Sequence, residues 1–429
     1  MKKLAINSGP KTRKTPFPSY DVIDNKEVRA VSKVLHSGIL SRFLGAWHPD
    51  FFGGPQVQGL EKEWAKYFKV KHAISVNSAT SGLISALGAV GIGPGDEVIV
   101  SPYSMSISAT APLFYGATPV FADVEPQYFC LDPKSVESKI TSRTKAIIVV
   151  DLFGQPYDAE SINKIAKKHK LVVIEDTAQA PGVKYKNKYT GTLGDIGVFS
   201  LNYHKHIHSG EGGIVVTDND ELADRVRLVR NHAEAVVEKK GTQDLTNMFG
   251  FNFRMTEIEA AIAREQLKKL RILINKRIKN INYLSKKLSD IKFISFAKAR
   301  PEAEHAYYTH PFLFDEKKAG VSRDIFLGAV KAELMPTKRR EGEGVKINSG
   351  YTKPLYLLPI FQKGMYFSKS KDYSYDKDNY KKGICPVVEN LHFKELGFHE
   401  LMHPNMTNRD LNDVVAAFKK VADNLDELK

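Results

Sequence analysis

Residues 195–213 read DIGVFSLNYHKHIHSGEGG, an apolar run that leads to a lone lysine, Lys205, and then to a glycine-rich turn. Upstream, residues 171–179 read LVVIEDTAQ, so a second apolar run ends at the carboxylate of Asp176. Pyridoxal phosphate needs an amine for its Schiff base and a carboxylate that keeps its ring nitrogen protonated. Together the two stretches predict a pyridoxal phosphate site in which Lys205 and Asp176 face one pocket.

Each of these residues also has a simpler interpretation. Asp176 precedes a possible helix start and could be a helix cap, and Lys205 could be a surface lysine in a basic loop. The carboxyl ends of parallel strands are, however, where α/β sheets place their ligands. The combination of both residues at the ends of neighbouring apolar runs favours the cofactor site.

Apolar strands and helices alternate along the first half of the chain, which predicts a mostly parallel central sheet flanked by helices. The predicted strands are His72–Val76, Glu97–Ser101, Pro119–Asp123, Ala146–Asp151, Leu171–Glu175, Asp195–Leu201 and Gly212–Thr217. The predicted helices between them are Ser81–Val90, Ser104–Tyr115, Ala159–His169 and Glu221–Arg230.

Three regions are predicted in the chain of 429 residues. An N-terminal arm covers 1–20, a large α/β domain covers 21–288, and a smaller C-terminal α+β domain covers 289–429. A helix over Asn25–Leu35, with Asn25 as its N-cap, opens the large domain. A long helix from Thr256 to about Leu288 closes it, and an amphipathic helix over Asn408–Leu428 ends the chain.

Composition limits the classes of protein to consider. No apolar stretch approaches the roughly 18 residues that span a bilayer, and two cysteines exclude a disulfide framework, so we expect a cytoplasmic protein without a membrane partner. The formal charge of +14 admits a nucleic-acid partner. Scattered basic residues without a nucleic-acid motif favour a lysine-rich surface instead, which also suits anionic small substrates.

A phosphate site is expected at Val76–Leu83, which reads VNSATSGL between a strand and a helix. Backbone N–H groups at a helix start bind phosphate, although an ordinary capped helix needs the same residue types. Ser200, on the strand before Lys205, could add a hydroxyl.

Other motifs give weaker evidence of function. His204, His206 and His208 would share a face on a strand, but no carboxylate or cysteine stands at ligand spacing, so no metal is predicted. Two polar segments, Lys338–Gly344 and Ser368–Lys382, are interpreted as exposed loops rather than binding patches.

Taken together, these motifs resemble the DegT/StrS family of pyridoxal-phosphate-dependent sugar aminotransferases, which have fold type I. The resemblance covers about Pro16 to Lys420. Its most specific segments are Val76–Leu83, Gly116–Asp123, Phe153–Pro156, Glu175–Gln179, Gly194–Ser200, Gly210–Gly213 and Gly250–Glu257.

The resemblance implies roles for matching positions around the cofactor ring. Lys205 falls where the family has its cofactor-linked lysine, and Asp176 matches the carboxylate on the pyridine nitrogen. Gln179 matches the residue that contacts the phenolic oxygen. Many relatives have an aromatic residue over the ring, where this chain offers Met105.

The same resemblance implies how the phosphate is held. Ala79, Thr80 and Ser200 match phosphate contacts within one subunit. Asn252 matches an asparagine that reaches the phosphate from a neighbouring subunit, which implies a homodimer with shared active sites.

Two departures from the family pattern bear on function. The aromatic stretch Arg42–Gly54 is longer than in typical members, which could reshape substrate access. Sugar 3-dehydratases of the family have histidine in place of the lysine, and their iron–sulfur relatives need several cysteines. Lys205 and the low cysteine count speak against both branches.

The expected function is a transaminase that moves an amino group from an amino acid, L-glutamate by resemblance, to a keto-sugar. A nucleotide-linked sugar for surface polysaccharide, lipopolysaccharide or antibiotic synthesis is the leading acceptor. A cyclitol, a free keto-sugar acid, or dehydration and aromatisation of an aminocyclohexenone remain alternatives. A pyridoxal-phosphate-binding regulator without turnover is a further alternative from another class.

Overall fold

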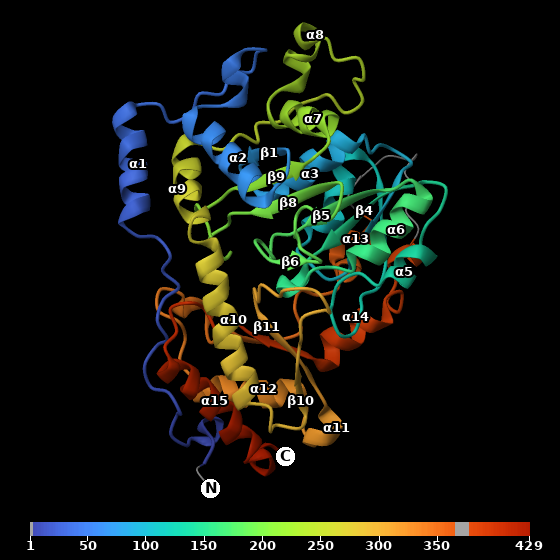
Figure 1. The fold of residues 1–429 in the computed structure, drawn as a ribbon. Helices are drawn as coiled ribbons and strands as arrows, with labels where there is room; N and C mark the ends of the chain where they lie inside the picture. Colours follow the sequence, from blue (N-terminus) through green and yellow to red (C-terminus); the bar gives the residue numbers. More distant parts are fainter. Residues whose placement is uncertain (1–2, 365–376) are drawn as a thin grey trace.

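The computed structural model describes residues 3–364 and 377–429. It contains a larger sheet with helices on both faces and a smaller sheet packed against α12 (Arg323–Glu333) and α15 (Asn408–Ala422). The two parts are connected by the long helix α10 (Leu270–Lys287), and both chain ends lie beside the smaller sheet (Figure 1).

The larger sheet has seven strands in the order β1-β9-β8-β5-β4-β2-β3. Their bounds are β1 His72–Val76, β2 Glu97–Val100, β3 Thr118–Phe121, β4 Thr144–Val150, β5 Val172–Asp176, β8 Ile196–Ser200 and β9 Gly213–Thr217. Strands β3, β2, β4, β5 and β8 pair in parallel, whereas β9 is antiparallel to β8 and β1. The predicted mostly parallel α/β sheet is confirmed, with strand bounds that differ from prediction by only a residue or two.

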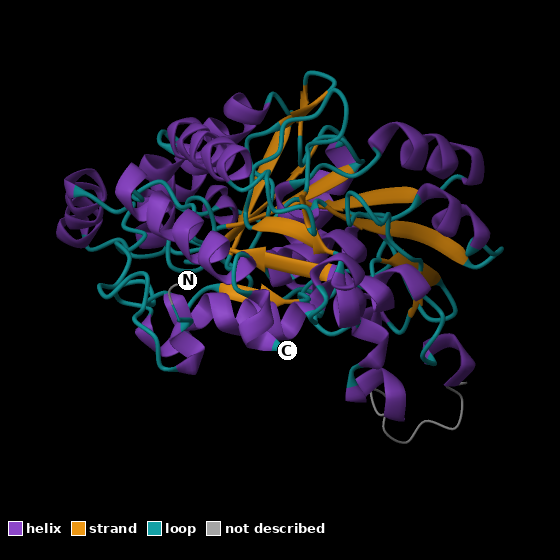
Figure 2. Ribbon diagram, turned by 90° about the horizontal axis from the view of Figure 1, so that it is seen from below, coloured by secondary structure: helices purple, strands orange, loops and turns teal. Residues whose placement is uncertain are grey.

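Helices cover both faces of this sheet, which is why its strands are almost wholly apolar (Figure 2). Along β8, Val198 packs in the cluster that contains α3 (Ala79–Val90). The next residue, Phe199, points to the other face, where its ring centroid lies 5.2 Å from that of Trp64 in α2 (Pro55–Phe68). This alternation fixes which side chains of β8 reach each helical layer.

Three of the four helices predicted between the strands agree closely with the structure, and the fourth does not. Helix α3 (Ala79–Val90) begins two residues before its predicted start at Ser81. Helices α6 (Ala159–His169) and α7 (Asp220–Arg230) occupy their predicted positions. The predicted helix Ser104–Tyr115 is instead a short α4 (Ile107–Thr110) and a 3₁₀ segment (Ala111–Tyr115). Pro112 lacks the N–H that a continuous α-helix would need there.

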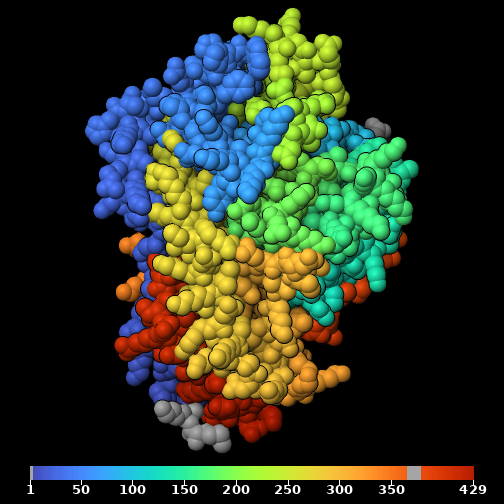
Figure 3. All heavy atoms as spheres, in the orientation of Figure 1, coloured from blue at the N-terminus to red at the C-terminus, as the bar shows by residue number. Residues whose placement is uncertain are grey.

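The predicted long helix from Thr256 is also divided. It forms α9 (Glu257–Leu267) and α10, because the chain tightens at Lys269, whose N–H donates to the carbonyl of Gln266 at 2.9 Å. In the space-filling view this segment, in yellow, runs from the N-terminal helices down to the C-terminal elements (Figure 3). Helix α10 ends at Lys287, next to residue 288, where the domain boundary is predicted.

Helix α1 (Asn25–Ser37) begins at a different cap from the one predicted. Asp24, not Asn25, is the N-cap, and its side chain and that of Glu27 form a reciprocal capping box. The helical spacing of the sequence predicts one apolar stripe that includes Val28, Val34 and Leu35. Val34 is buried, whereas Val28 and Leu35 are 59% and 55% exposed. The helix therefore leaves part of its apolar stripe uncovered by its own chain.

The smaller sheet is antiparallel throughout, in the order β10-β11-β13-β12. Its strands are β10 Ile294–Phe296, β11 His310–Phe314, β12 Ile347–Ser349 and β13 Leu396–His399. The predicted C-terminal helix ends earlier than expected, since α15 stops at Ala422 and a 3₁₀ turn covers Leu425–Leu428. The other elements are a hairpin of β6 (Lys184–Tyr185) and β7 (Lys188–Tyr189), and helices α5 (Pro133–Ser138), α8 (Val237–Lys240), α11 (Glu316–Ala319), α13 (Pro359–Lys363) and α14 (Pro386–Asn390).

Most of the predicted loop Ser368–Lys382 lies outside the described residues. Within the described ranges, no helix combines the length and the apolar composition that crossing a membrane requires.

The N-terminal arm is anchored on the smaller sheet's helices by one buried carboxylate. Glu333, fully buried in α12, accepts hydrogen bonds from the backbone N–H groups of Ala5 at 2.8 Å and Thr12 at 2.9 Å. Lys420 of α15 donates to the same carboxylate at 2.8 Å. One side chain therefore joins the arm, α12 and α15.

We expect Glu333→Ala to lower the free energy of unfolding by about 3 kcal/mol, because it leaves Lys420 and two partly buried N–H groups without their acceptor. Burial opposes ionisation of Glu333, but its hydrogen bonds, above all that from Lys420, hold its pKa below the usual range. Its contribution is thus present above the unfolded-state pKa and lost as pH falls through the folded-state pKa.

Denaturant unfolding across pH tests this expectation. The exposed Glu341→Ala is the matched control. An equal loss in both variants would contradict the anchoring role of Glu333.

Candidate active site

Lys205 lies in a turn just beyond the end of β8. Its backbone N–H donates to the carbonyl of Asn202 at 2.9 Å. The Ser209 N–H donates to the carbonyl of Leu201 at 3.0 Å, so a hydrogen bond joins the two ends of the turn. The Lys205 Nζ atom lies 4.5 Å from the centroid of the Tyr308 ring. Burial of the amine lowers the pKa of Lys205, and the nearby Asp176 carboxylate opposes this shift.

Asp176 ends β5, the parallel neighbour of β8, and pairs in register with Val198. Its Oδ1 accepts from the Ala178 N–H at 3.1 Å, and its Oδ2 accepts from the Ser108 hydroxyl at 3.3 Å. Burial raises the pKa of Asp176, while the Ala178 N–H and the charge of Lys205 favour its ionised form. A cationic ring nitrogen nearby would favour that form further.

Both residues line one cavity of about 360 Å³, which we call the lysine cavity. It lies at the carboxyl ends of the parallel strands, where the sequence predicts the ligand site. Of the residues predicted for the site, the structure brings seven together here: Lys205, Asp176, Gln179, Ala79, Thr80, Ser200 and Met105.

Gln179 is held in place by two hydrogen bonds. Its Oε1 accepts from the Phe153 N–H at 2.8 Å, and its Nε2 donates to the Tyr351 hydroxyl at 3.2 Å. Tyr351 also lines the cavity, so the amide spans the gap between the larger sheet and a loop of the C-terminal half.

The start of α3 lines the cavity. Ser78 is its N-cap and accepts from the Ser81 N–H at 3.0 Å, which leaves the N–H groups of Ala79 and Thr80 without helical partners. The close approach of β9 requires glycine, because a Cβ on Gly213 would lie 2.7 Å from the Ala79 nitrogen. A lysine amine, a buried carboxylate and a helix start in one cavity fit pyridoxal phosphate.

Asn252 does not lie in this cavity. It is exposed, and its Oδ1 accepts from Arg254 Nε at 2.7 Å. Asn252 is therefore not placed to contact a phosphate in the lysine cavity of its own subunit. Met105 lines the cavity with 55% of its surface exposed.

The three histidines next to Lys205 are not on a strand, because the segment is a turn. His204 lines the lysine cavity, whereas His206 is buried and its Nε2 lies 2.9 Å from the Ala306 carbonyl oxygen. Their shared face, which a metal site would need, is absent. Across residues 3–364 and 377–429, no group of three or more metal-ligating side chains is positioned to hold an ion.

Sequence reasoning missed three residues of the lysine cavity and its immediate support. Tyr308 and Tyr351 come from the C-terminal half, and Ser108 from the broken helix after β2. Burial raises the pKa of both tyrosines, so they are neutral hydroxyls. No local motif marks them, since only the packing of the two parts brings them to the cavity.

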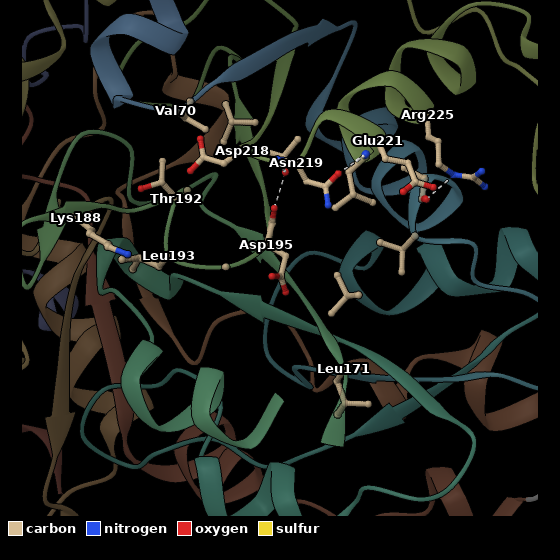
Figure 4. A pocket seen from close by; sticks show the side chains of 18 of the residues that line it. Val70, Leu171, Lys188, Thr192, Leu193, Asp195, Asp218, Asn219, Glu221 and Arg225 are labelled. Carbon is tan, nitrogen blue, oxygen red and sulfur yellow. Dashed lines mark hydrogen bonds between the residues drawn. The ribbon is translucent and has the colours of Figure 1, made fainter. Parts of the chain in front are cut away.

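A larger cavity of about 580 Å³, here the distal cavity, lies at the opposite edge of the sheet (Figure 4). Several of its polar groups are hydrogen-bonded within the protein. Arg225 donates to Ala89 O at 2.8 Å and Asp244 Oδ2 at 2.9 Å, and Asp195 Oδ2 accepts from Val173 N–H at 2.8 Å. Because these side chains already bind other parts of the protein, we interpret the distal cavity as structural. The lysine cavity is therefore the candidate active site.

Comparison with known proteins agrees with this geometry. Residues 23–419 match the family described as DegT/DnrJ/EryC1/StrS aminotransferases. The chain belongs to this family. The resemblance predicted from sequence is thereby confirmed, and the chain is an aminotransferase as expected. Enzymes of this family depend on pyridoxal phosphate.

Relatives within the DegT/DnrJ/EryC1/StrS family match over much of their length. The spore coat polysaccharide biosynthesis protein SpsC of Bacillus subtilis (strain 168) is 31% identical over 95% of this chain and 97% of its own length. The GDP-perosamine synthase of Caulobacter vibrioides is 42% identical over 53% of this chain and 61% of its own.

A solved aminotransferase structure has the same fold. The aminotransferase from Psychrobacter cryohalolentis superposes with a TM-score of 0.81 at 29% identity, over 96% of this chain and 100% of that structure. The predicted fold type I of the DegT/DnrJ/EryC1/StrS family is therefore confirmed.

We expect Asp176→Asn to lower the pKa of Lys205 further, because the amide keeps the shape of the carboxylate but no longer attracts the ammonium. The pH dependence of acylation at Lys205 in cofactor-free protein, followed by peptide mass spectrometry, measures this shift.

The control for this measurement is Asp423→Asn, at an exposed site just beyond α15. A Lys205 pKa that stays the same or rises in Asp176→Asn would contradict the interaction.

Proposed function

We propose that this protein transfers an amino group from L-glutamate to a nucleotide-linked keto-sugar, giving 2-oxoglutarate and an amino-sugar. The observation that carries this proposal is the placement of Lys205 and Asp176 across one buried cavity beside the start of α3. The site residues and their roles are part of the proposal.

Pyridoxal phosphate, when bound, supplies the electron sink that makes amine transfer possible. Ala79 and Thr80 N–H groups and the Ser200 hydroxyl hold the phosphate, where the α3 dipole favours negative charge. Asp176 stays ionised and keeps the ring nitrogen protonated. Gln179, fixed by Phe153 and Tyr351, orients the phenolic oxygen.

Lys205 binds the cofactor through its Nζ atom and moves a proton once that atom is released. A lowered pKa suits this work, because a neutral Nζ would be able to accept a proton from the substrate carbon and to donate it again. Tyr308, whose ring lies against the amine, limits the approach of water. Met105 is proposed to cover the ring where many relatives have an aromatic residue.

The acceptor class is supported by the names of two relatives. One is a GDP-perosamine synthase and the other a spore coat polysaccharide biosynthesis protein. An excess of 14 positive charges is compatible with an anionic substrate. We propose that the product enters surface polysaccharide, lipopolysaccharide or antibiotic sugar synthesis, and that the enzyme works in the cytoplasm.

A homodimer with shared active sites is the second part of the proposal. Asn252 is exposed and outside its own lysine cavity, as a residue that serves a partner must be. Apolar side chains left exposed on α1 and the following segment, such as Val28, Leu35 and Leu40, suit burial against a second copy.

We expect Lys205→Ala to abolish both the visible absorbance that pyridoxal phosphate gives to the wild type and labelling of this peptide on borohydride reduction. Turnover of glutamate with keto-sugars should fall at least about a thousandfold, because the proton carrier is lost.

Lys188→Ala, at an exposed lysine of the distal cavity, is the control and should behave as wild type. A wild type that remains colourless with the cofactor would defeat the proposal. Product formation without 2-oxoglutarate would instead indicate dehydration chemistry.

Subunit mixing tests the shared site. We expect Asn252→Ala to weaken cofactor binding by about tenfold, the value of one charge-assisted hydrogen bond. At limiting cofactor, Lys205→Ala and Asn252→Ala homodimers that are unfolded and refolded together should recover about a quarter of wild-type activity, because half of the random dimers then contain one intact site out of two.

Recovery would not occur if Asn252 served its own subunit, since every site with Lys205 would then lack Asn252. Refolding each variant alone is the control for simple reactivation.

A further inference from the structure

Tyr103 is fully buried next to the lysine cavity but does not line it. It follows β2, and the two residues after it, Ser104 and Met105, both line the cavity. The Tyr103 hydroxyl accepts a hydrogen bond from the Tyr351 backbone N–H at 2.6 Å. Tyr351 lines the cavity from the C-terminal half of the chain. One side chain of the larger part of the fold therefore holds a cavity residue that belongs to the other part.

Two neighbouring hydrogen bonds join the same two segments. The Leu355 N–H donates to the Pro102 carbonyl at 2.8 Å, and the Thr352 hydroxyl donates to the Ser104 carbonyl at 2.8 Å. Both of these acceptors are backbone groups. A substitution of the Tyr103 side chain can therefore remove its own contact and leave the other two in place.

His392 gives the Tyr103 hydroxyl a second partner. Its Nδ1 atom lies 3.3 Å from the phenol oxygen. Burial, and next the Arg323 guanidinium, lowers the pKa of His392, so the ring is neutral at physiological pH. Burial raises the pKa of Tyr103, so the phenol keeps its proton and donates it to Nδ1. The buried hydroxyl therefore both accepts and donates a hydrogen bond.

The chain is also fixed immediately before Tyr351. Gly350 has a φ of +63°, a left-handed conformation that suits glycine, and a Cβ there would lie 2.6 Å from His392 Nδ1. The Gly350 N–H donates to the Leu396 carbonyl at 2.7 Å. The close approach to His392 and the contact with Tyr103 therefore define the path of the chain into Tyr351.

The position of Tyr351 decides how Gln179 presents its amide. The Phe153 N–H donates to Gln179 Oε1 at 2.8 Å, which identifies the oxygen end of the amide. The Nε2 end has two N–H groups, and one of them donates to the Tyr351 hydroxyl at 3.2 Å. The other remains for the phenolic oxygen, which is the contact proposed for Gln179. The Tyr351 hydroxyl thus fixes the direction of the N–H group that faces the cofactor.

We propose that Tyr103 is a positioning residue of this active site. It holds the Tyr351 loop against the larger sheet, and through the Tyr351 hydroxyl it orients the N–H group with which Gln179 contacts the phenolic oxygen. This inference rests on the proposed function, because it assigns Gln179 a contact with the bound cofactor. Tyr103 itself touches neither cofactor nor substrate.

The variant Tyr103→Phe removes the hydroxyl and keeps the ring. We expect the pH titration of the bound cofactor's visible absorbance to move up by about 0.5 pH unit, because a hydrogen bond donated to the phenolic oxygen favours the form that has lost a proton. Cofactor affinity, measured by titrating cofactor-free protein, should fall about fivefold.

The matched control is Tyr115→Phe. Tyr115 is also buried, lies outside the lysine cavity, and donates its hydroxyl to the Ile84 carbonyl at 3.0 Å. Each variant loses one buried hydrogen bond, so thermal unfolding should show similar losses of stability. Tyr115→Phe should nevertheless keep the wild-type titration and affinity.

A double-mutant cycle with Tyr351→Phe traces the path. Tyr351→Phe removes the hydroxyl that Gln179 binds. In that background Tyr103→Phe should change cofactor affinity by less than about twofold, because the group that it positions is already gone. Losses that simply multiply would overturn the path through Tyr351.

A titration in Tyr103→Phe that matches that of Tyr115→Phe would overturn the positioning role. Reaction with glutamate, followed by the cofactor's absorbance, separates this inference from the proposed function. A wild type that binds the cofactor but exchanges no amino group with glutamate would defeat the proposed function, whereas the titration of Tyr103→Phe would still decide the role of Tyr103.

Discussion

The active site depends on an amine and a carboxylate that are buried together at one edge of a sheet. Burial acts on the two groups in opposite directions, lowering the pKa of Lys205 and raising that of Asp176. Each charge offsets part of the other's loss of hydration. The parallel pairing of β5 with β8 enforces this proximity, because Asp176 is in register with Val198 and the lysine turn begins just beyond β8.

A second carboxylate, Glu175, stabilises the path of the chain between these two strands. It points to the opposite side of β5 and accepts from the N–H groups of Gly191 at 2.6 Å, Leu193 at 2.8 Å and Gly194 at 3.1 Å. Since β8 begins directly after this loop, Glu175 helps set the register that brings Lys205 opposite Asp176. The two successive acidic residues therefore have different roles: Glu175 positions the backbone, and Asp176 faces the cavity.

Sequence predicted the sheet well because short apolar runs are what a sheet covered on both faces requires. Lys205, Asp176 and Ser200 were predicted from the strand ends, whereas the resemblance to the family implied Gln179, Ala79, Thr80 and Met105. All seven line one cavity. Features set by distant contacts were not predictable. Tyr308 and Tyr351 arrive with the C-terminal half, and the break before α10 accompanies Gln266 and Lys269, whose side chains bind the Val22 carbonyl from far along the chain.

The two walls of the active site differ in what holds them. The wall formed by the sheet edge and the α3 start is fixed by strand pairing and packing, which suits the constant task of holding a cofactor. The other wall consists of the Tyr203 turn, Tyr308 and Tyr351, which a few hydrogen bonds join to the rest of the site. Loops tolerate substitution better than buried strands, so a family with one chemistry and many acceptors would vary this wall.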